Sequence, residues 1–187
     1  MAIDKEYITA TDYLHDIWRL SCGIAKSGFK PDVLIALWRG GAPVGVAVHE
    51  FLSYLGYEIR HIPLKCSSYT GIGENGSMVQ FEHPEVVFNS LNKTDKVLIV
   101  DDVFDTGETA KAVLEKMEGL CKDVKIACTY WKKPQNRTGI VPDFFVKEVG
   151  CTWLVFPHEM LCLSNDELKQ KDEVLFNMIL ECKRNVR

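Results

Sequence analysis

One stretch of this chain, residues 97–109, constrains its fold more than any other part of the sequence. Four consecutive apolar residues at 97–100 predict a strand that is buried on both faces, as in a parallel sheet. Two adjacent acids, Asp101 and Asp102, follow at the carboxyl end of this strand. A short loop at 105–109 and apolar residues at helical spacing come next. This order predicts a ligand site at the carboxyl edge of an α/β sheet.

The loop at 105–109 has the composition of a phosphate-binding turn. Thr106, Gly107 and Thr109 can direct backbone N–H groups and hydroxyls toward one point, at the start of a helix whose dipole favours an anion. Gly107 also allows the backbone to approach a ligand closely. A phosphate beside the acidic pair is repelled unless the two acids face sugar hydroxyls or a metal ion. A phosphorylated sugar meets both requirements.

Hydrophobic patterns predict the other elements of the chain. A helix is expected to begin after Thr9 or Thr11 and to end at Gly28. The remaining predicted elements are a strand at 33–37, a helix at 43–55, a strand at 57–64, a helix ending near 120, strands at 124–130, 143–149 and 152–156, and a polar helix from Asn165. The strand at 33–37, the helix at 43–55 and the strand at 57–64 form a βαβ unit, which predicts a parallel sheet with right-handed crossovers.

The stretch at 97–109 resembles the phosphoribosyl diphosphate motif of the type I phosphoribosyltransferases. This resemblance implies an α/β fold, with a parallel sheet flanked by helices and a small hood region over the active site. It covers about residues 33–159 of a single domain at 1–187, with a helical tail at 160–187. Without the resemblance, the same stretch also fits a strand end with solvated acids before a capped helix.

The resemblance implies roles for the residues of this motif. The residues expected to bind the ribose and its 5-phosphate are Asp101, Asp102, Asp105, Thr106, Gly107, Glu108 and Thr109. Asp105 is also expected to be the catalytic base that accepts a proton from the purine ring. Glu108 is an acid in an anion-binding loop, so we expect its side chain to point to solvent.

A second loop, Arg39-Gly40-Gly41, follows the strand predicted at 33–37 and shares the carboxyl edge of the sheet with the acidic pair. Two glycines permit close approach to a ligand, and a guanidinium group binds phosphate oxygens through a planar fork. The loop resembles the diphosphate-binding loop of the family, with Arg39 and Gly40 as its binding residues. Trp38 departs from the small residue often found there, and taken alone the loop also fits a turn with an exposed arginine.

The segment at 66–83 carries three glycines and no persistent apolar period, which predicts a long irregular segment with a function. Within it, Ser68 and Tyr69 resemble the mobile catalytic loop of the purine enzymes. They are expected to hydrogen-bond the diphosphate while the loop excludes water. A disordered surface loop fits the sequence of this segment equally well.

The family's purine site is also matched. Lys132-Lys133-Pro134 resembles the segment whose lysine donates to the 6-oxo group of a purine. Counting back from the proline selects Lys133, and Lys132 is the other option. Trp153 is expected to stack on the purine, and the backbone of Leu154 to bind its edge. A solvated face for the lysines and a core position for Trp153 are the alternatives.

The implied reaction is displacement of diphosphate from the ribose C1 carbon by a purine nitrogen, through an oxocarbenium-like transition state. The implied substrates are phosphoribosyl diphosphate and a 6-oxopurine (hypoxanthine, guanine or xanthine), in purine salvage. Mg²⁺ is the implied cofactor, because it suits phosphate, hydroxyl and water oxygens with few protein carboxylates. Asp102 is its candidate ligand, and Glu159 is a weaker one because an exposed acid explains that position equally well.

Charge and cysteine content bear on the alternative function and on the cellular compartment. A transcriptional regulator that senses phosphoribosyl diphosphate is the alternative function, but it needs a basic surface, whereas the net charge here is −4. We therefore expect no nucleic acid partner. Seven cysteines without a C-x-x-C pair fit a reducing cytoplasm, and no apolar run approaches the length of a membrane span. We expect a cytoplasmic homo-oligomer, either a dimer or a tetramer.

Overall fold

The structure is a computed structural model. It describes residues 4–70, 77–161 and 163–185, with only the backbone described at 67–70, 77–78 and 185. The chain divides into two compact units, one formed by Leu14–Cys151 and the other by Met1–Tyr13 together with Thr152–Arg187. Each unit is described by itself below. The prediction of a single domain over the whole chain stays a prediction.

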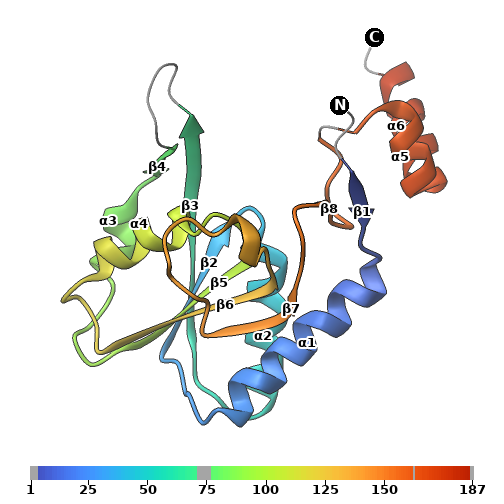
Figure 1. Cartoon of the computed structure of the whole chain (residues 1–187). Helices are drawn as coiled ribbons and strands as arrows, with labels where there is room; N and C mark the ends of the chain where they lie inside the picture. Colours follow the sequence, from blue (N-terminus) through green and yellow to red (C-terminus); the bar gives the residue numbers. More distant parts are fainter. Residues whose placement is uncertain (1–3, 71–76, 162, 186–187) are drawn as a thin grey trace. The chain divides into compact units, whose positions relative to one another are not determined.

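A six-stranded sheet in the order β4-β3-β2-β5-β6-β7 forms the centre of the unit Leu14–Cys151 (Figure 1). Its strands are β2 (Val33–Trp38), β3 (Arg60–Thr70), β4 (Ser77–Phe81), β5 (Lys96–Phe104), β6 (Asp123–Trp131) and β7 (Phe144–Glu148). Neighbouring strands are parallel, apart from the antiparallel pair of β3 and β4. The predicted α/β fold with a mainly parallel sheet is confirmed.

Helices cover both faces of this sheet, which explains why its central strands are apolar throughout. The four residues at 97–100 of β5 are all fully buried. Helix α2 (Gly41–Tyr54) packs on β2 and β5. Helices α3 (Pro84–Phe88) and α4 (Glu108–Met117) pack on the opposite face, where Val87, Val113 and Met117 join the core formed by the odd-numbered residues of β2. A strand buried on both faces cannot alternate apolar with polar residues.

Helix α1 (Ala10–Lys26) is joined to the sheet through a buried carboxylate. Asp16 is fully buried and accepts hydrogen bonds from Tyr130 of β6 at 2.8 Å, Lys147 of β7 at 2.6 Å and Arg19 at 2.7 Å. Burial alone would raise the pKa of Asp16, but the hydrogen bonds from Lys147, Tyr130 and Arg19 outweigh it and hold the pKa below its ordinary value. The carboxylate is therefore charged and satisfied at neutral pH.

The prediction of an irregular segment at 66–83 is wrong for the part that the structure describes. Strand β3 continues to Thr70 and pairs with β4, with Cys66 opposite Phe81. Antiparallel pairing satisfies the backbone whatever the side chains are, so a polar sequence without an apolar period can still form a hairpin. The glycines at 71, 73 and 76 lie outside the described residues.

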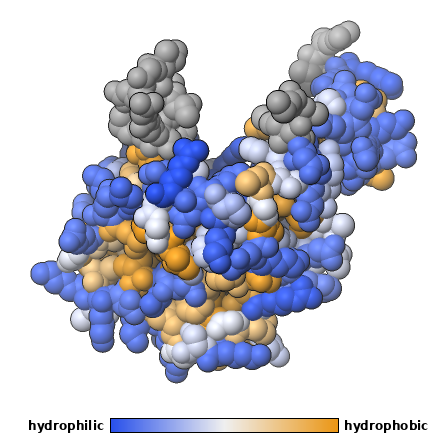
Figure 2. All heavy atoms as spheres, in the orientation of Figure 1, coloured by the Kyte–Doolittle hydropathy of each residue, from blue (hydrophilic) through white to orange (hydrophobic). Residues whose placement is uncertain are grey.

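The second unit contains a two-stranded parallel sheet of β1 (Lys5–Tyr7) and β8 (Trp153–Val155), followed by helices α5 (Asn165–Lys171) and α6 (Glu173–Asn185). Ser164 and Glu167 form a capping box at the start of α5. The single helix predicted from Asn165 is wrong in one respect, because the backbone is extended at Asp172 and divides it. The visible surface of α5 and α6 is mostly hydrophilic, as predicted (Figure 2). None of the helices in the described ranges is both long and apolar enough to cross a membrane.

Candidate active site

The acidic pair lies near the carboxyl end of β5, where backbone hydrogen bonds fix it. The backbone N–H of Asp102 donates to the Asp101 carboxylate at 3.0 Å, and that of Val103 donates to the Asp102 carboxylate at 2.7 Å. Thr129 of β6 donates to the backbone carbonyl of Asp102 at 2.6 Å. Burial, and then the neighbouring Asp102 carboxylate, raise the pKa of Asp101 well above its ordinary value. A pair of this kind favours ligands that donate hydrogen bonds or bring positive charge.

The loop at 105–109 joins β5 to the start of α4. Gly107 has φ of 84°, in the region that favours glycine, and precedes the first helical residue, Glu108. The backbone N–H of Lys111 donates to the Gly107 carbonyl at 2.9 Å, which begins the hydrogen bonding of the helix. The backbone N–H of Glu108 donates to the Thr106 hydroxyl at 3.4 Å. The loop thus lies at the positive end of a ten-residue helix, the position at which helices bind phosphate groups.

A second loop, at 136–140, supports this turn from the side. The backbone N–H of Arg137 donates to the Thr106 carbonyl at 2.9 Å. A Cβ atom on Gly107 would collide with the Thr138 hydroxyl, so the two loops are in direct contact. Asn136 accepts a hydrogen bond from the Thr138 backbone at 3.1 Å. The sequence carries no signal for this loop, because residues 136–140 have neither an apolar period nor a motif.

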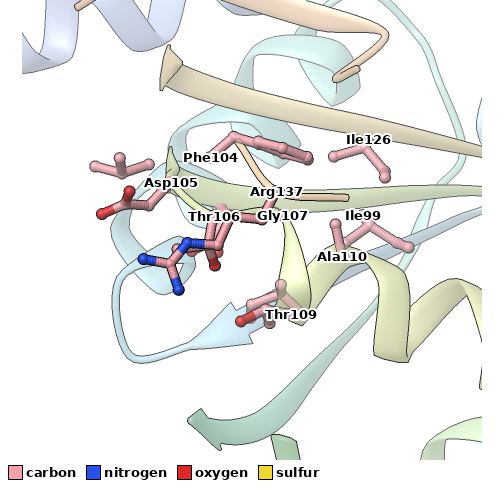
Figure 3. A pocket seen from close by; sticks show the side chains of 12 residues that line it. Ile99, Phe104, Asp105, Thr106, Gly107, Thr109, Ala110, Ile126 and Arg137 are labelled. Atoms are coloured by element: carbon pink, nitrogen blue, oxygen red, sulfur yellow. The ribbon is translucent and has the colours of Figure 1, made fainter. Parts of the chain in front are cut away.

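The strand end and the two loops enclose a cavity of about 360 Å³ (Figure 3). The predicted site residues that line it are Asp101, Asp105, Thr106, Gly107 and Thr109. Apolar side chains from the sheet, including Leu37 and Ile99, form its interior wall, and Arg137 also lines it. The structure thus brings most of the predicted ribose and phosphate residues to one cavity.

The predicted diphosphate loop lies directly against the acidic pair. A cis peptide bond joins Trp38 and Arg39. A Cβ atom on Gly40 would collide with the Asp102 carboxylate, and one on Gly41 would collide with the carbonyl oxygen of Val100. Both positions therefore need glycine for contact within the protein. The side chain of Arg39 is exposed at this edge of the sheet.

The two candidate lysines have different surroundings. Lys132 is buried, and its Nζ lies 3.3 Å from the Asp105 carboxylate. Gln135, in the short 3₁₀ helix η1 (Lys133–Gln135), also donates to Asp105 when its amide nitrogen faces that carboxylate. Lys133 is exposed and lies 3.4 Å from Glu148. The structure thus places Lys132, and not Lys133, beside the predicted catalytic base.

The other predicted site residues are placed as follows. Ser68 and Tyr69 lie in β3, where their backbones pair with β4, and their side chains are outside the description. Trp153 and Leu154 lie in β8 of the second unit, the former 47% exposed and the latter buried. Glu159 belongs to the same unit and accepts a hydrogen bond from the Phe156 backbone at 3.1 Å. Trp153, Leu154 and Glu159 are not placed relative to the cavity, which belongs to the other unit.

Oxygen ligands for a metal ion are present in the form that Mg²⁺ prefers. Within the described ranges, no group of three or more His, Cys, Asp or Glu side chains could hold an ion by itself. Mg²⁺ usually binds through one or two carboxylates together with water and phosphate oxygens, and the adjacent carboxylates of Asp101 and Asp102 fit that pattern. Burial, and then the charge of Asp101, raise the pKa of the nearby Cys66 thiol to about 12, which favours the neutral thiol over the thiolate.

Comparisons with known proteins identify relatives over most of the chain. The model of the phosphoribosyl transferase domain family matches residues 8–163. A hypoxanthine/guanine phosphoribosyltransferase from Methanocella paludicola is 30% identical over 112 residues, which cover 57% of this chain and 56% of the relative. Its counterpart from Methanocella arvoryzae is 25% identical over 120 residues, which cover 63% and 59%. The matched region thus spans between half and two thirds of these curated relatives.

Solved structures agree with the family model. The crystal structure of a purine phosphoribosyltransferase from Pyrococcus horikoshii is 30% identical, with a TM-score of 0.69 over 87% of this chain and 99% of that chain. A Neisseria gonorrhoeae protein described as hypothetical, solved with bound ppGpp, has a TM-score of 0.72 at 24% identity, which shows the fold alone. The matching domain, the mainly parallel sheet and the loop after β5 together show that this chain belongs to the phosphoribosyl transferase domain family, as its motif predicted.

Proposed function

We propose that this chain is a purine phosphoribosyltransferase that transfers the phosphoribosyl group of phosphoribosyl diphosphate to a 6-oxopurine and releases diphosphate, in purine salvage. The observation that carries the proposal is the meeting of three features at one edge of the sheet: the acidic pair, the anion-binding loop at 105–109 and the loop around Gly40. The names of the relatives, hypoxanthine/guanine and purine phosphoribosyltransferases, support this choice of substrate.

In this proposal each end of the sugar phosphate has its own binding group. The 5-phosphate binds the backbone N–H groups and hydroxyls of the loop at 105–109, while the ribose hydroxyls donate to Asp101 and Asp102. The guanidinium of Arg39, the backbone at Gly40 and the hydroxyls of Ser68 and Tyr69 bind the diphosphate. Arginine suits that end because its fork matches phosphate oxygens.

The difficult step of the reaction is the departure of diphosphate from the ribose C1 carbon, because negative charge develops on the leaving group. Fixed hydrogen-bond donors that face the developing charge lower such a barrier in a site with little water. Mg²⁺, when bound, neutralises part of the diphosphate charge; Asp102 and, more weakly, Glu159 are its proposed ligands. Arg39 then binds the departing group and holds it away from the ribose C1 carbon.

The purine is bound through its edge and its face. The 6-oxo group and N7 are neighbours on one edge of a 6-oxopurine, so the groups that contact them must also be neighbours. Lys132 and Asp105 meet that condition at 3.3 Å, and we therefore propose that Lys132 donates to the 6-oxo group while Asp105 accepts the ring proton. Lys133, selected from the sequence, remains the other option. Trp153 is proposed to stack on the purine, with the Leu154 backbone at its edge.

The proposal is tested by measuring diphosphate release from phosphoribosyl diphosphate and Mg²⁺ with a panel of free bases. We expect release with hypoxanthine, guanine or xanthine, and much less with adenine or orotate, which lack the matching edge. Equal rates of diphosphate release with every base, or the same rate without any base, would contradict the proposed specificity for 6-oxopurines. Absence of release with all five bases would contradict the proposed activity itself.

Replacing the catalytic base gives the sharper test. Asp105→Asn keeps the shape of the side chain but removes its capacity to accept a proton. We expect kcat to fall roughly 10²–10⁴-fold, the usual contribution of a general base, with the affinity for phosphoribosyl diphosphate nearly unchanged. Steady-state kinetics and calorimetric titration separate the two quantities. Wild-type turnover in the variant would refute the role of Asp105.

The cellular setting belongs to the same proposal. The described cysteines are free thiols, which agrees with a reducing cytoplasm. We propose that the enzyme acts there on free bases as a homo-oligomer, either a dimer or a tetramer. Sedimentation of the purified chain would decide between these states and a monomer.

A further inference from the structure

We propose that Arg137 is a further binding residue of this site, whose guanidinium pairs with the 5-phosphate of phosphoribosyl diphosphate and of the nucleotide product. The inference rests on the proposed phosphoribosyl transfer and deepens it. It assigns the selectivity for a phosphorylated sugar to a residue outside the loop at 105–109. Three observations carry it: the charge of the cavity, the position of the loop at 136–140, and the surroundings of the guanidinium.

The charge of the cavity needs a cation at the phosphate end. Among the residues that line it, Asp101 and Asp105 are acidic and Arg137 is basic. Glu108 adds a further acid in the first turn of α4. A phosphate monoester carries roughly −1.5 to −2 charges at neutral pH, whereas a helix N-terminus supplies only about +0.5. Arg137 supplies the positive charge that the loop itself lacks.

The backbone of Arg137 is fixed against the phosphate loop. Its N–H donates to the Thr106 carbonyl at 2.9 Å, and Asn136 braces the turn by donating to the Ile140 carbonyl at 2.7 Å. In Figure 3 the guanidinium extends toward the same end of the cavity as the Asp105 carboxylate and the Thr106 side chain. A side chain that starts from a fixed backbone loses less entropy when it binds, so little affinity is spent on ordering it.

The guanidinium is available to a ligand. Arg137 is exposed, and no residue in the described ranges accepts a hydrogen bond from its side chain or forms an ion pair with it. In contrast, Lys111 on α4 lies 4.0 Å from Glu115, and Lys125 on β6 lies 2.9 Å from Asp143. An arginine without an internal partner can give both arms of its fork to one phosphate, which a lysine cannot do.

The test compares Arg137→Gln with Arg137→Lys and with Lys111→Gln, which removes the same charge from outside the cavity. Calorimetric titration with ribose 5-phosphate, inosine monophosphate and inosine measures the part of the affinity that depends on the phosphate. We expect Arg137→Gln to weaken both phosphorylated ligands about tenfold or more, since each tenfold step corresponds to about 1.4 kcal/mol, a typical value for one charge-assisted hydrogen bond. Inosine should bind equally to all four proteins. Arg137→Lys should fall between wild type and Arg137→Gln, and Lys111→Gln should match wild type.

Two results would overturn the inference. Either Arg137→Gln binds ribose 5-phosphate as tightly as wild type, or it loses inosine and inosine monophosphate to the same extent, which indicates a general disturbance of the cavity. Thermal melts of the variants identify a folding defect independently of binding. Kinetically, the KM for phosphoribosyl diphosphate should rise in Arg137→Gln with kcat little changed.

The inference and the proposed function fail in different ways. Wild-type protein that binds ribose 5-phosphate through Arg137 but releases no diphosphate with any base would support the phosphate contact and contradict the transferase activity. If the wild-type protein releases diphosphate and Arg137→Gln changes neither the KM for phosphoribosyl diphosphate nor the affinity for ribose 5-phosphate, the transferase activity is supported and the phosphate contact is contradicted. Wild-type protein that releases diphosphate with a 6-oxopurine but does not bind ribose 5-phosphate would overturn the inference and leave the proposed function standing.

Discussion

Gly40 and Gly107 show what single residues contribute to this site. From sequence, both glycines suggested a backbone that approaches a ligand closely. In the structure, the atom that a Cβ at Gly40 would meet belongs to Asp102, and the atom that a Cβ at Gly107 would meet belongs to Thr138. Each glycine therefore lets two distant segments of the protein touch. The groups that would hold the ligand are assembled by contacts that leave no room for a side chain.

The pair Lys132 and Lys133 allows a matched prediction at this scale. We expect Lys132→Met to raise the KM for hypoxanthine and to lower kcat, together reducing kcat/KM about 100-fold, because it removes both the donor to the 6-oxo group and the cation beside Asp105. Lys133→Met removes the same charge from a position that faces Glu148, and its effect should be smaller. Steady-state kinetics with varied base concentration rank the two. The opposite ranking would restore Lys133 as the residue that contacts the base.

Lys132 and Lys133 show how a register taken from sequence can miss by one residue. Neighbouring residues of an extended segment face opposite sides, so an error of one position moves a side chain from the site to the solvent. The proline after Lys133 offered a register, but the hydrogen bond from the Lys132 backbone to the Phe104 carbonyl at 2.8 Å decides which lysine lies beside Asp105. Nothing in the sequence marks Arg137 as a site residue, because its position at the cavity depends on a contact between two loops.

At the scale of elements, the predictable parts are those with a long apolar run or a sharp stop signal. Strand β5, the turn at Gly107 and α4 were predicted within a few residues, because four apolar residues, a glycine and a helical period occur in sequence. Strand β1 and helix α3 have three and five residues, too few to show a period, and they were missed. Strand β4 was missed because its pairing depends on backbone hydrogen bonds with β3.

The link between α1 and the sheet gives a prediction about stability. Asp16→Asn keeps a hydrogen-bonding group but leaves Lys147 and Arg19 without their buried anion. We expect the free energy of unfolding at pH 7 to fall by about 2 kcal/mol, less than for a fully buried pair because both cations are at least half exposed. Urea denaturation followed by circular dichroism measures this difference. Glu115→Gln, an exposed acid on α4, is the control and should change stability by less than about 0.5 kcal/mol.

The effect of Asp16→Asn on the free energy of unfolding should also depend on pH. The pKa of Asp16 is lowered in the folded protein, so its stabilising contribution is complete above the pKa of the unfolded chain, about 3.9. The contribution is lost as the pH falls through the lower pKa of the folded state. The difference in unfolding free energy between wild type and Asp16→Asn should therefore be constant from about pH 7 to pH 5 and shrink below about pH 4. A difference that instead grew in acid would contradict a lowered pKa.

At the scale of the whole molecule, charge separates the two functions that this fold could serve. An enzyme needs positive charge only where the substrate phosphates bind, and we propose Arg39 and, in the cavity, Arg137 for these positions. A regulator needs positive charge spread over a surface that follows the nucleic acid backbone. The net charge of −4 and the lack of any run longer than two basic residues fit the first case. The names of the relatives point the same way.

This contrast gives the last prediction. Wild-type protein should show no retention of duplex DNA or RNA in a filter-binding assay, even at about 50 mM salt, where electrostatic binding is strong. A known basic DNA-binding protein serves as the positive control, and the same preparation is assayed for diphosphate release. Retention that weakens steeply with salt and responds to phosphoribosyl diphosphate would indicate a sensing regulator. Release of diphosphate without retention of nucleic acid would indicate that the acidic pair and both phosphate-binding loops act in phosphoribosyl transfer. A sensor needs no catalytic base at Asp105, whereas a transferase does.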